Sequence, residues 1–176
     1  MASLRLVRLP FFRSRSSRGV ARLVRTKGQA AAVPPPPPPP QPRELIDVVG
    51  VAATETAGGV ALTLLSLKRY REGHVALFRL LRARGRFERD YPFPSLGLAV
   101  TPEGTVPYHF WMMGGSGGGG MREIEYRLSY AIAPAPSSDM SETVIEVREI
   151  SWERQDDGTR KVVAVDTGPW RFSLGH

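Results

Sequence analysis

The chain has 176 residues, with 24 Lys and Arg against 17 Asp and Glu, and a sequence pI near 10.4. It contains no cysteine, which excludes disulfide frameworks, Cys-ligated zinc, iron–sulfur clusters and thiol catalysis. No window approaches the ~20 uninterrupted apolar residues of a membrane-spanning helix, so we expect no membrane span.

The excess positive charge lies in the first 28 residues, which include no acidic residue. Residues 43–176 carry 16 basic and 17 acidic residues, a net charge of −1, so bulk positive charge is not a property of the predicted domain. The basic arm is a candidate contact to nucleic acid or an anionic membrane surface. Its eight cations are Arg5, Arg8, Arg13, Arg15, Arg18, Arg22, Arg25 and Lys27.

Residues 1–33 are Arg-rich, contain Ser and interleave apolar residues, a composition typical of mitochondrial or plastid transit peptides. A secretory signal is excluded because no apolar core of about 7 to 15 residues separates the arginines. The alternative is a disordered basic arm, which includes the case of a start codon placed too far upstream. Residues 34–42 follow as a polyproline linker, a stiff spacer of about 3.1 Å per residue.

From residue 43 to residue 176 the apolar residues alternate with a period of two, which predicts β-strands. The clearest strand is 122–133, and 143–154 is a second one whose phase changes near Arg148 and Glu149, indicating a β-bulge there. Asp157-Gly158 is the best hairpin signal in the chain. Weaker strands are predicted at 45–53, 60–70, 74–83, 96–101, 106–112, 161–165 and 170–174, separated by turns that include Gly58-Gly59 and Gly168-Pro169.

Residues 64–86 are ambiguous, because Leu77, Leu80 and Leu81 also have helical spacing. We favour two antiparallel strands that turn at Glu72-Gly73, since short strands surround the segment on both sides. About eight strands without helices predict an antiparallel two-sheet, immunoglobulin-like sandwich, mainly β, behind a disordered N-terminal arm. The aromatic residues of these strands predict an aromatic core between the sheets.

Three segments carry a resemblance to known proteins: the strand at 60–70 followed by Gly73, the glycine insert after Trp111, and the closing residues 168–172. In these the chain resembles uncharacterised bacterial, especially actinobacterial, immunoglobulin-like β-sandwich proteins. The resemblance implies a bacterial cytoplasmic location and brings no activity or site residues with it. A eukaryotic source would instead place the protein in a mitochondrion or plastid.

The glycine insert at 114–120 formally contains Gly-x-Gly-x-x-Gly, but a strand rather than a helix is predicted after it, so we do not expect a dinucleotide site. We interpret it as a mobile loop flanked by methionines, an adaptable loop that could contact a ligand or a protein partner. The residues of this candidate site are Met112, Met113, Gly115, Ser116, Gly117 and Met121.

Catalytic and metal-binding patterns are missing from the sequence. The three histidines, His74, His109 and His176, have no second ligand at metal-binding spacing, and no nucleophile motif is present. We therefore expect no enzyme activity, no cofactor and no metal. The leading hypothesis is a non-catalytic interaction or structural module, whose exposed edge strands would allow self-association or strand addition to an unidentified protein partner. The alternative is tethering to nucleic acid or anionic lipid through the basic arm.

Overall fold

The computed structural model describes residues 38–84, 92–102, 106–120, 122–135 and 140–175. The basic arm, residues 34–37 of the polyproline linker and the candidate loop residue Met121 lie outside the described residues, so the predictions made for them stay predictions.

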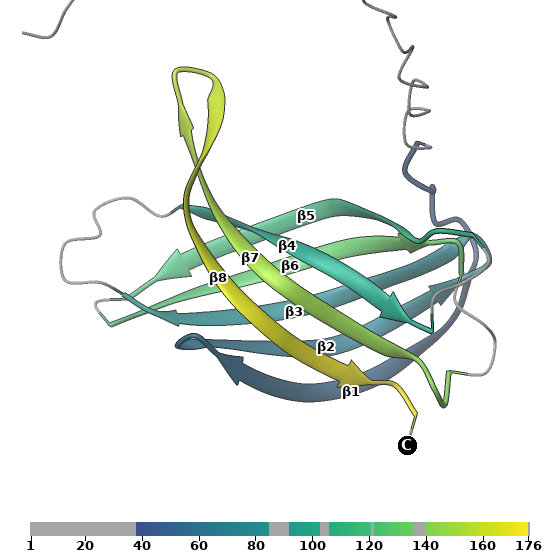
Figure 1. Cartoon of the computed structure of the whole chain (residues 1–176). Coiled ribbons are helices and arrows are strands. Elements are labelled where there is room, and N and C mark those ends of the chain that lie inside the picture. The colour runs from purple at the N-terminus through teal and green to yellow at the C-terminus, as the bar shows by residue number, and fades with distance from the viewer. Residues whose placement is uncertain (1–37, 85–91, 103–105, 121, 136–139, 176) are drawn as a thin grey trace, which may run out of the picture. The chain divides into compact units, whose positions relative to one another are not determined.

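Eight strands run through the described residues and form two antiparallel sheets that pack face to face (Figure 1). Five of them form one sheet in the order β1-β2-β3-β6-β5, and three form the other in the order β4-β7-β8. Their bounds are β1 Leu45–Ala57, β2 Val60–Tyr70, β3 Gly73–Ala83, β4 Phe93–Thr101, β5 His109–Gly119, β6 Glu123–Ala133, β7 Val144–Asp156 and β8 Thr159–Ser173.

The strand order confirms the predicted sandwich. Without β1, the sheets read β2-β3-β6-β5 and β4-β7-β8, which is the ABED and CFG order of a constant-type immunoglobulin sandwich. Strand β1 adds a fifth strand beside β2. The chain crosses between the sheets after β3, after β4 and after β6, and these crossings leave β1 and β8 as edges on one side and β5 and β4 as edges on the other.

The core is built from the inward positions of both sheets, as the two-residue period predicts. On β3, Ala76, Phe78 and Leu80 are fully buried, while their neighbours Val75, Leu77 and Arg79 are half-buried on the outer face. The predicted aromatic core is confirmed, because Trp152, Trp170 and Phe172 of the smaller sheet and Phe78, Tyr126 and Tyr130 of the larger one are all buried, with several edge-to-face ring contacts.

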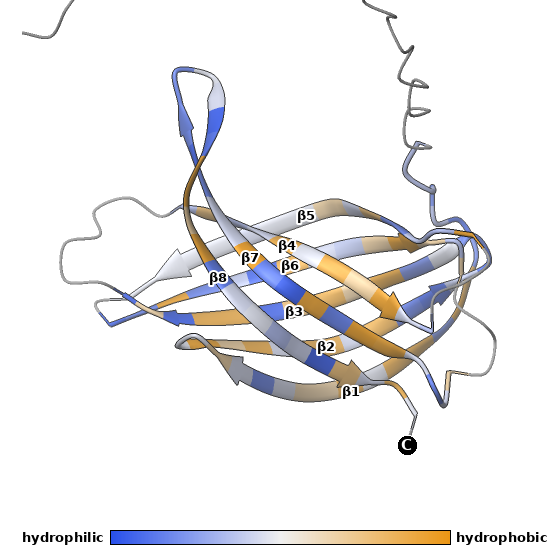
Figure 2. Cartoon of the chain, in the orientation of Figure 1, coloured by the Kyte–Doolittle hydropathy of each residue, from blue (hydrophilic) through white to orange (hydrophobic). Residues whose placement is uncertain are grey.

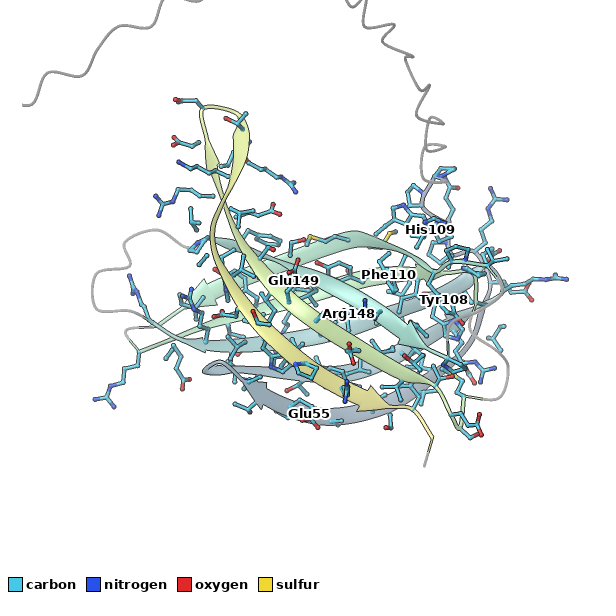
Figure 3. The ribbon with its side chains drawn as sticks, viewed as in Figure 1. Glu55, Tyr108, His109, Phe110, Arg148 and Glu149 are labelled. Atoms are coloured by element: carbon cyan, nitrogen blue, oxygen red, sulfur yellow. The ribbon has the colours of Figure 1, made fainter. Side chains whose placement is uncertain are left out.

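Several local predictions are also confirmed. Of the ambiguous segment 64–86, residues 64–83 belong to the β2–β3 hairpin and not to a helix, and residues 85 and 86 lie outside the described residues. The register of β7 shifts at Arg148, which leaves Arg148 and Glu149 both exposed, and Figure 3 shows their side chains on the smaller sheet. The β7–β8 turn is made by Asp157 and Gly158, both with positive φ, as expected for a two-residue hairpin loop.

Two predictions at the end of the chain and in the glycine insert are wrong. The strands expected at 161–165 and 170–174 are one continuous strand, β8, because Gly168-Pro169 forms a bulge opposite Arg148 instead of a turn. The glycine insert is not a loop either: Gly114 to Gly119 continue strand β5 and pair in register with β6. Glycine is depleted in strands because it lacks packing surface, so a seven-residue run of Gly and Ser favoured a loop.

The β1/β8 side of the sandwich is closed by contacts between the sheets. Strand β1 packs against β8, and the indole Nε1 of Trp170 donates a hydrogen bond to the carbonyl oxygen of Val60 over 3.2 Å. On the same strand, the carboxylate of Asp166 accepts a hydrogen bond from Trp152 Nε1 at 2.6 Å. The Trp170 bond joins β8 to β2 of the larger sheet, and the Trp152 bond holds β7 and β8 together within the smaller one.

The β7–β8 hairpin extends beyond the sandwich as a two-stranded arm, here defined as residues 154–163 (Figures 1 and 2). Its neighbour β4 begins at Phe93, which pairs with Glu153, so the arm has no third strand beside it among the described residues. All ten residues of the arm are exposed, and Val162 and Val163 are 52% and 43% exposed.

Candidate binding site at the free edge of β5

The candidate residues from the glycine insert lie on the edge strand β5. Met112 is half-buried and packs against the core, whereas Met113 is 46% exposed at a shift in the register with β6. Gly115, Ser116 and Gly117 follow in regular pairing with β6. These residues therefore lie on the edge of a strand with regular pairing, and not in the loop that the sequence predicts.

Strand β5 has one neighbour, β6, and its other edge is free in the described part of the chain. The amide of Gly120 bonds to the carbonyl oxygen of Glu123 at 2.9 Å, and hydrogen-bonded pairs alternate along an antiparallel ladder. Counting along the regular register, the N–H and C=O groups of Gly115, Gly117 and Gly119 point away from β6. They form a row of main-chain donors and acceptors along the free edge.

The inward glycines are required by aromatic rings that lie under β5. A Cβ added to Gly115 would collide with the ring of Phe93 from β4, and one added to Gly117 would collide with the ring of Tyr126 from β6. By contrast, a Cβ on the outward Gly118 would meet nothing within 4 Å. The glycine run thus lets β5 lie directly on the aromatic rings and leaves Ser116 as its one side chain between Gly114 and Gly119. The pale end of β5 in Figure 2 marks the intermediate hydropathy of these residues.

The facing edge, β4, is blocked in two ways. Pro94 has no N–H to offer, and the N–H of Leu96 donates to the hydroxyl of Tyr130 at 2.8 Å. A second tyrosine, Tyr126, donates its hydroxyl to the carbonyl oxygen of Pro92 at 2.8 Å. Burial raises the pKa of Tyr130, so its hydroxyl stays protonated. The two tyrosines of β6 therefore satisfy backbone groups at the other edge, and the ring of Tyr126 lies beneath Gly117 of β5.

A shallow trough of about 700 Å³ lies on the outer face beside the end of β5, with Gly118, Gly119 and Gly120 as part of its lining. In the adjoining hollow of about 260 Å³, Ser116 and Gly117 face Arg127. The charged and apolar residues of the trough are Arg79, Leu81, Arg122, Glu123 and Glu125.

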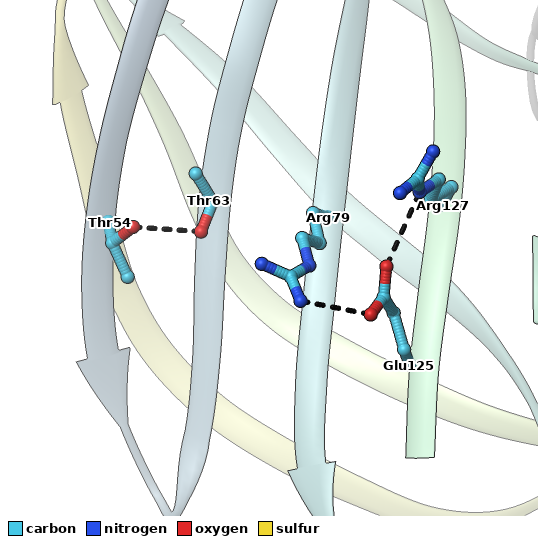
Figure 4. Close-up of polar contacts among 5 residues, drawn as sticks. All are labelled: Thr54, Thr63, Arg79, Glu125 and Arg127. Carbon is cyan, nitrogen blue, oxygen red and sulfur yellow. Dashed lines mark hydrogen bonds and ion pairs between the residues drawn. The ribbon is translucent and has the colours of Figure 1, made fainter. Parts of the chain in front are cut away.

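One carboxylate serves two guanidinium groups in this trough (Figure 4). Glu125 accepts a hydrogen bond from Arg79 Nη2 at 2.9 Å and another from Arg127 Nε at 3.3 Å. The hydrogen bond from Arg79 is the main reason why the pKa of Glu125 lies below its usual range, and Arg127 adds to the effect. Arg122 makes no ion pair with a described residue. When Arg127 of the adjoining hollow is included, three arginines face two glutamates on this outer side, an excess of one positive charge.

A second hollow of about 340 Å³ lies on the inner side, between the β5 and β4 edges and the base of the arm. Phe93 and Met112 supply its apolar surface. Its polar lining comes from the base of the arm and contains Glu153, Arg154, Gln155 and Arg160. The free edge of β5 thus has hollows on both faces of the sheet.

The histidines do not form a reactive cluster. His74 is 4% exposed on the inward side of β3, and both of its ring nitrogens lack a hydrogen-bond partner among the described residues. Burial and the neighbouring Arg69 lower its pKa to about 4, against a smaller opposing effect of Asp47. His109 stacks near Trp111 at the start of β5, where Figure 3 labels it, and His176 is outside the described residues. No group of three or more His, Asp or Glu side chains suited to a metal ion occurs in the described residues.

Comparison of the chain with protein-family models, curated proteins and solved structures finds no match. Of the resemblance drawn from the sequence, what holds is the coarse statement, a mainly β protein with two antiparallel sheets. The part of the chain that the structure describes includes no helix long and apolar enough to span a membrane.

Sequence reasoning found the glycine insert and missed its surroundings. Phe93, Tyr126, Arg79 and Arg127 come from three other strands, and nothing in their local sequence connects them with the insert. One signal was available: the period of two continues through Gly115, Gly117 and Gly119, opposite a strand whose alternate residues include Tyr126. A glycine-rich strand that lies on packed rings needs glycine at the alternate positions that face those rings.

Proposed function

We propose that the protein is a non-catalytic interaction module that binds an extended segment of a partner protein by adding it as a strand to the free edge of β5. The observation that carries this proposal is the row of main-chain N–H and C=O groups of Gly115, Gly117 and Gly119 that point away from β6 along the free edge. These glycines have no side chain that would obstruct an added strand. Strand addition takes its affinity from such main-chain hydrogen bonds and its specificity from hollows on alternate sides of the added strand.

The two free edges of this side differ in how they are protected. Natural sheets block their edges with proline, charged side chains or covering groups, and β4 follows this rule through Pro94 and the Tyr130 hydroxyl. From Gly114 to Gly119, β5 carries neither proline nor charge. Because glycine adds no hydrophobic surface, this edge is open to specific pairing without being a general aggregation site.

The test is a selection from a random ten-residue peptide library displayed on phage, with the full chain as bait. Enriched peptides are synthesised, and amide hydrogen exchange of the protein is measured with and without them. We expect slower exchange at Gly115, Gly117 and Gly119 and no change at Gly50, in the edge strand β1. Failure to enrich any peptide that protects these three amides would contradict the proposal.

A second proposal concerns the basic arm, and the observation that favours it is the segregation of eight cations and no acid in residues 1–28. We propose that the basic arm at the N-terminus tethers the domain to duplex DNA or to anionic lipid. Replacing all eight by Gln in the full chain is expected to abolish binding to duplex DNA or to phosphatidylserine vesicles at low salt. Equal binding by the two proteins would exclude the tether.

A further inference from the structure

The charges around the free edge of β5 point to the chemistry of the segment that pairs with it. The hollows on its two faces are lined by five arginines, Arg79, Arg122, Arg127, Arg154 and Arg160, and by three glutamates, Glu123, Glu125 and Glu153. The edge thus has a surplus of positive charge, whereas residues 43–176 as a whole have a net charge of −1. The surplus lies beside the edge of β5, which is open in the described part of the sandwich body.

The outer face offers donors at the right place for an added strand. In an antiparallel pair, residues directly opposite each other have their side chains on the same face of the sheet. A partner residue opposite Ser116 or Gly118 therefore projects its side chain over the trough. There Arg79 and Arg127 share Glu125, and each guanidinium has five N–H donors, of which the shared carboxylate uses few.

Arg122 strengthens this arrangement at the end of the strand. It is exposed, lines the trough beside Gly118 to Gly120, and pairs with no acid among the described residues. Nearby, Arg84 Nη1 donates to the carbonyl oxygen of Gly120 at 3.2 Å, which brings another guanidinium to the same turn. Carboxylates placed here would form charge-assisted hydrogen bonds, which are stronger than neutral ones.

We propose that the free edge of β5 binds an acidic extended peptide segment, with its carboxylates on the outer face over Arg79, Arg122 and Arg127. This inference rests on the proposed function and specifies the partner of the same site. Charge decides against a second copy of the chain as the occupant, because pairing β5 with its own copy would bring two positively charged edges together. The trough lining contains no aromatic ring on which bases could stack, which favours a peptide over single-stranded nucleic acid.

The probes are three blocked ten-residue peptides in which Thr alternates with Glu, with Gln or with Lys, and binding is measured by titration against the full chain. We expect the Glu peptide to bind at least tenfold more tightly than the Gln peptide, and the Lys peptide not to bind. Raising the salt from about 0.05 to 0.5 M should weaken the Glu peptide and leave the Gln peptide nearly unchanged.

Methylation of the peptide amides tests the strand geometry. With the Glu side chains on the outer face, the N–H groups of the Thr residues are the ones that point toward β5. N-methylation of the Thr amides should abolish binding, whereas N-methylation of the Glu amides should leave it largely intact. If both methylated peptides bind as the parent does, the attraction is electrostatic alone and strand addition at β5 is refuted.

Matched variants locate the charge effect. Gly118→Glu places a carboxylate on the outer face of β5, and Gly50→Glu places one on β1, at a position where a Cβ likewise has open space. The first should weaken the Glu peptide tenfold or more relative to Gly118→Gln, which adds the same bulk without the charge, and Gly50→Glu should not change the binding of either peptide. Arg122→Gln should weaken the Glu peptide several-fold.

The possible failures are distinguishable. If neutral and acidic peptides protect Gly115, Gly117 and Gly119 equally well, the acidic partner is refuted and the proposed function stands. If no peptide protects these amides, the proposed function itself fails. Tighter binding of a ten-nucleotide poly(dT) strand than of the Glu peptide, lost in Arg122→Gln, would overturn the inference in favour of nucleic acid. A stable dimer of the full chain in sedimentation, broken by Gly118→Glu, would overturn it in favour of self-association.

Discussion

The strand edges on the two lateral sides of the sandwich differ in how they are protected from pairing. On the β1/β8 side, the extra strand β1 packs against β8, and the Trp170 indole bridges the sheets through its bond to Val60. On the β5/β4 side, β4 is blocked by Pro94 and Tyr130, while β5 is bare and open. A sandwich needs its edges covered to remain unpaired, so among the described residues of the sandwich body the uncovered edge of β5 is the place where pairing with another chain costs least.

The largest expected effect is on the closed side. Trp170→Ala removes a fully buried indole and leaves the carbonyl of Val60 without its partner, which should lower the free energy of unfolding by about 3–5 kcal/mol. Urea denaturation followed by far-UV circular dichroism measures it. The control, Trp111→Ala on the half-buried outer face of β5, should cost about 1 kcal/mol. Equal losses would show that the bridge at Trp170 does not matter.

The next effect tests why the open edge consists of glycine. Gly117→Ala forces a methyl group against the Tyr126 ring and should destabilise the fold by about 2–3 kcal/mol. Gly118→Ala, its neighbour with open space on the outer face, should be neutral or stabilise by about 0.5 kcal/mol because alanine has less freedom in the unfolded chain. A similar stability for both variants would mean that the inward glycines are not required by the aromatic rings.

A pH dependence should originate near the closed side, where Asp47, Arg69 and His74 lie across β1, β2 and β3. Because the pKa of His74 in the folded state is about 4, below its usual 6.5, the unfolded chain binds the proton more readily between these values. The stability that neutral His74 contributes is therefore fully present above pH 6.5 and is lost as the pH falls to 4, by about 2 kcal/mol after allowance for solvent near the end of the sandwich. Unfolding free energies of the wild type and of His74→Leu between pH 7 and 4 measure it. A slope that persists unchanged in the variant would assign it to other groups.

The smallest effect concerns the blocked edge β4. Tyr130→Phe removes the acceptor of the Leu96 amide and should cost about 1 kcal/mol while accelerating hydrogen exchange at Leu96. Amide exchange by NMR resolves that position, with Val147 in the middle of the sheet as the internal reference. If the Leu96 amide exchanges as slowly in the variant, the tyrosine does not protect this edge.

Much of the fold could be predicted from the sequence, because apolar and polar residues alternate along a strand that has one buried face. The alternation along 122–133 and 74–83 predicts which side chains are buried, and the break in phase at Arg148 and Glu149 predicts the bulge. The turn at Asp157-Gly158 has local chemistry that few alternatives satisfy. These features depend on neighbours in the chain, so one sequence suffices to find them.

The candidate site could be predicted only in part. The glycine insert stands out in the sequence, but its local chemistry favours a loop, because an isolated glycine run has no reason to form a strand. The reason comes from Phe93 of β4 and Tyr126 of β6, whose rings occupy the space that side chains on β5 would need. The turn predicted at Gly168-Pro169 was wrong for the same reason. This pair is typical of turns, but the pairing of β8 with β7 holds it within a strand.

By itself, the sequence determined that the chain has a net-neutral, cysteine-free β domain of two antiparallel sheets behind a basic arm, since composition and periodicity are local properties. Only the tertiary structure decided which strand edges are closed and which is open. Edge protection depends on residues far apart in the chain, such as Trp170 with Val60 and Tyr130 with Leu96, whose meeting is set by the order of the strands. The same long-range order places five arginines around the bare edge of β5 and makes it the candidate binding site.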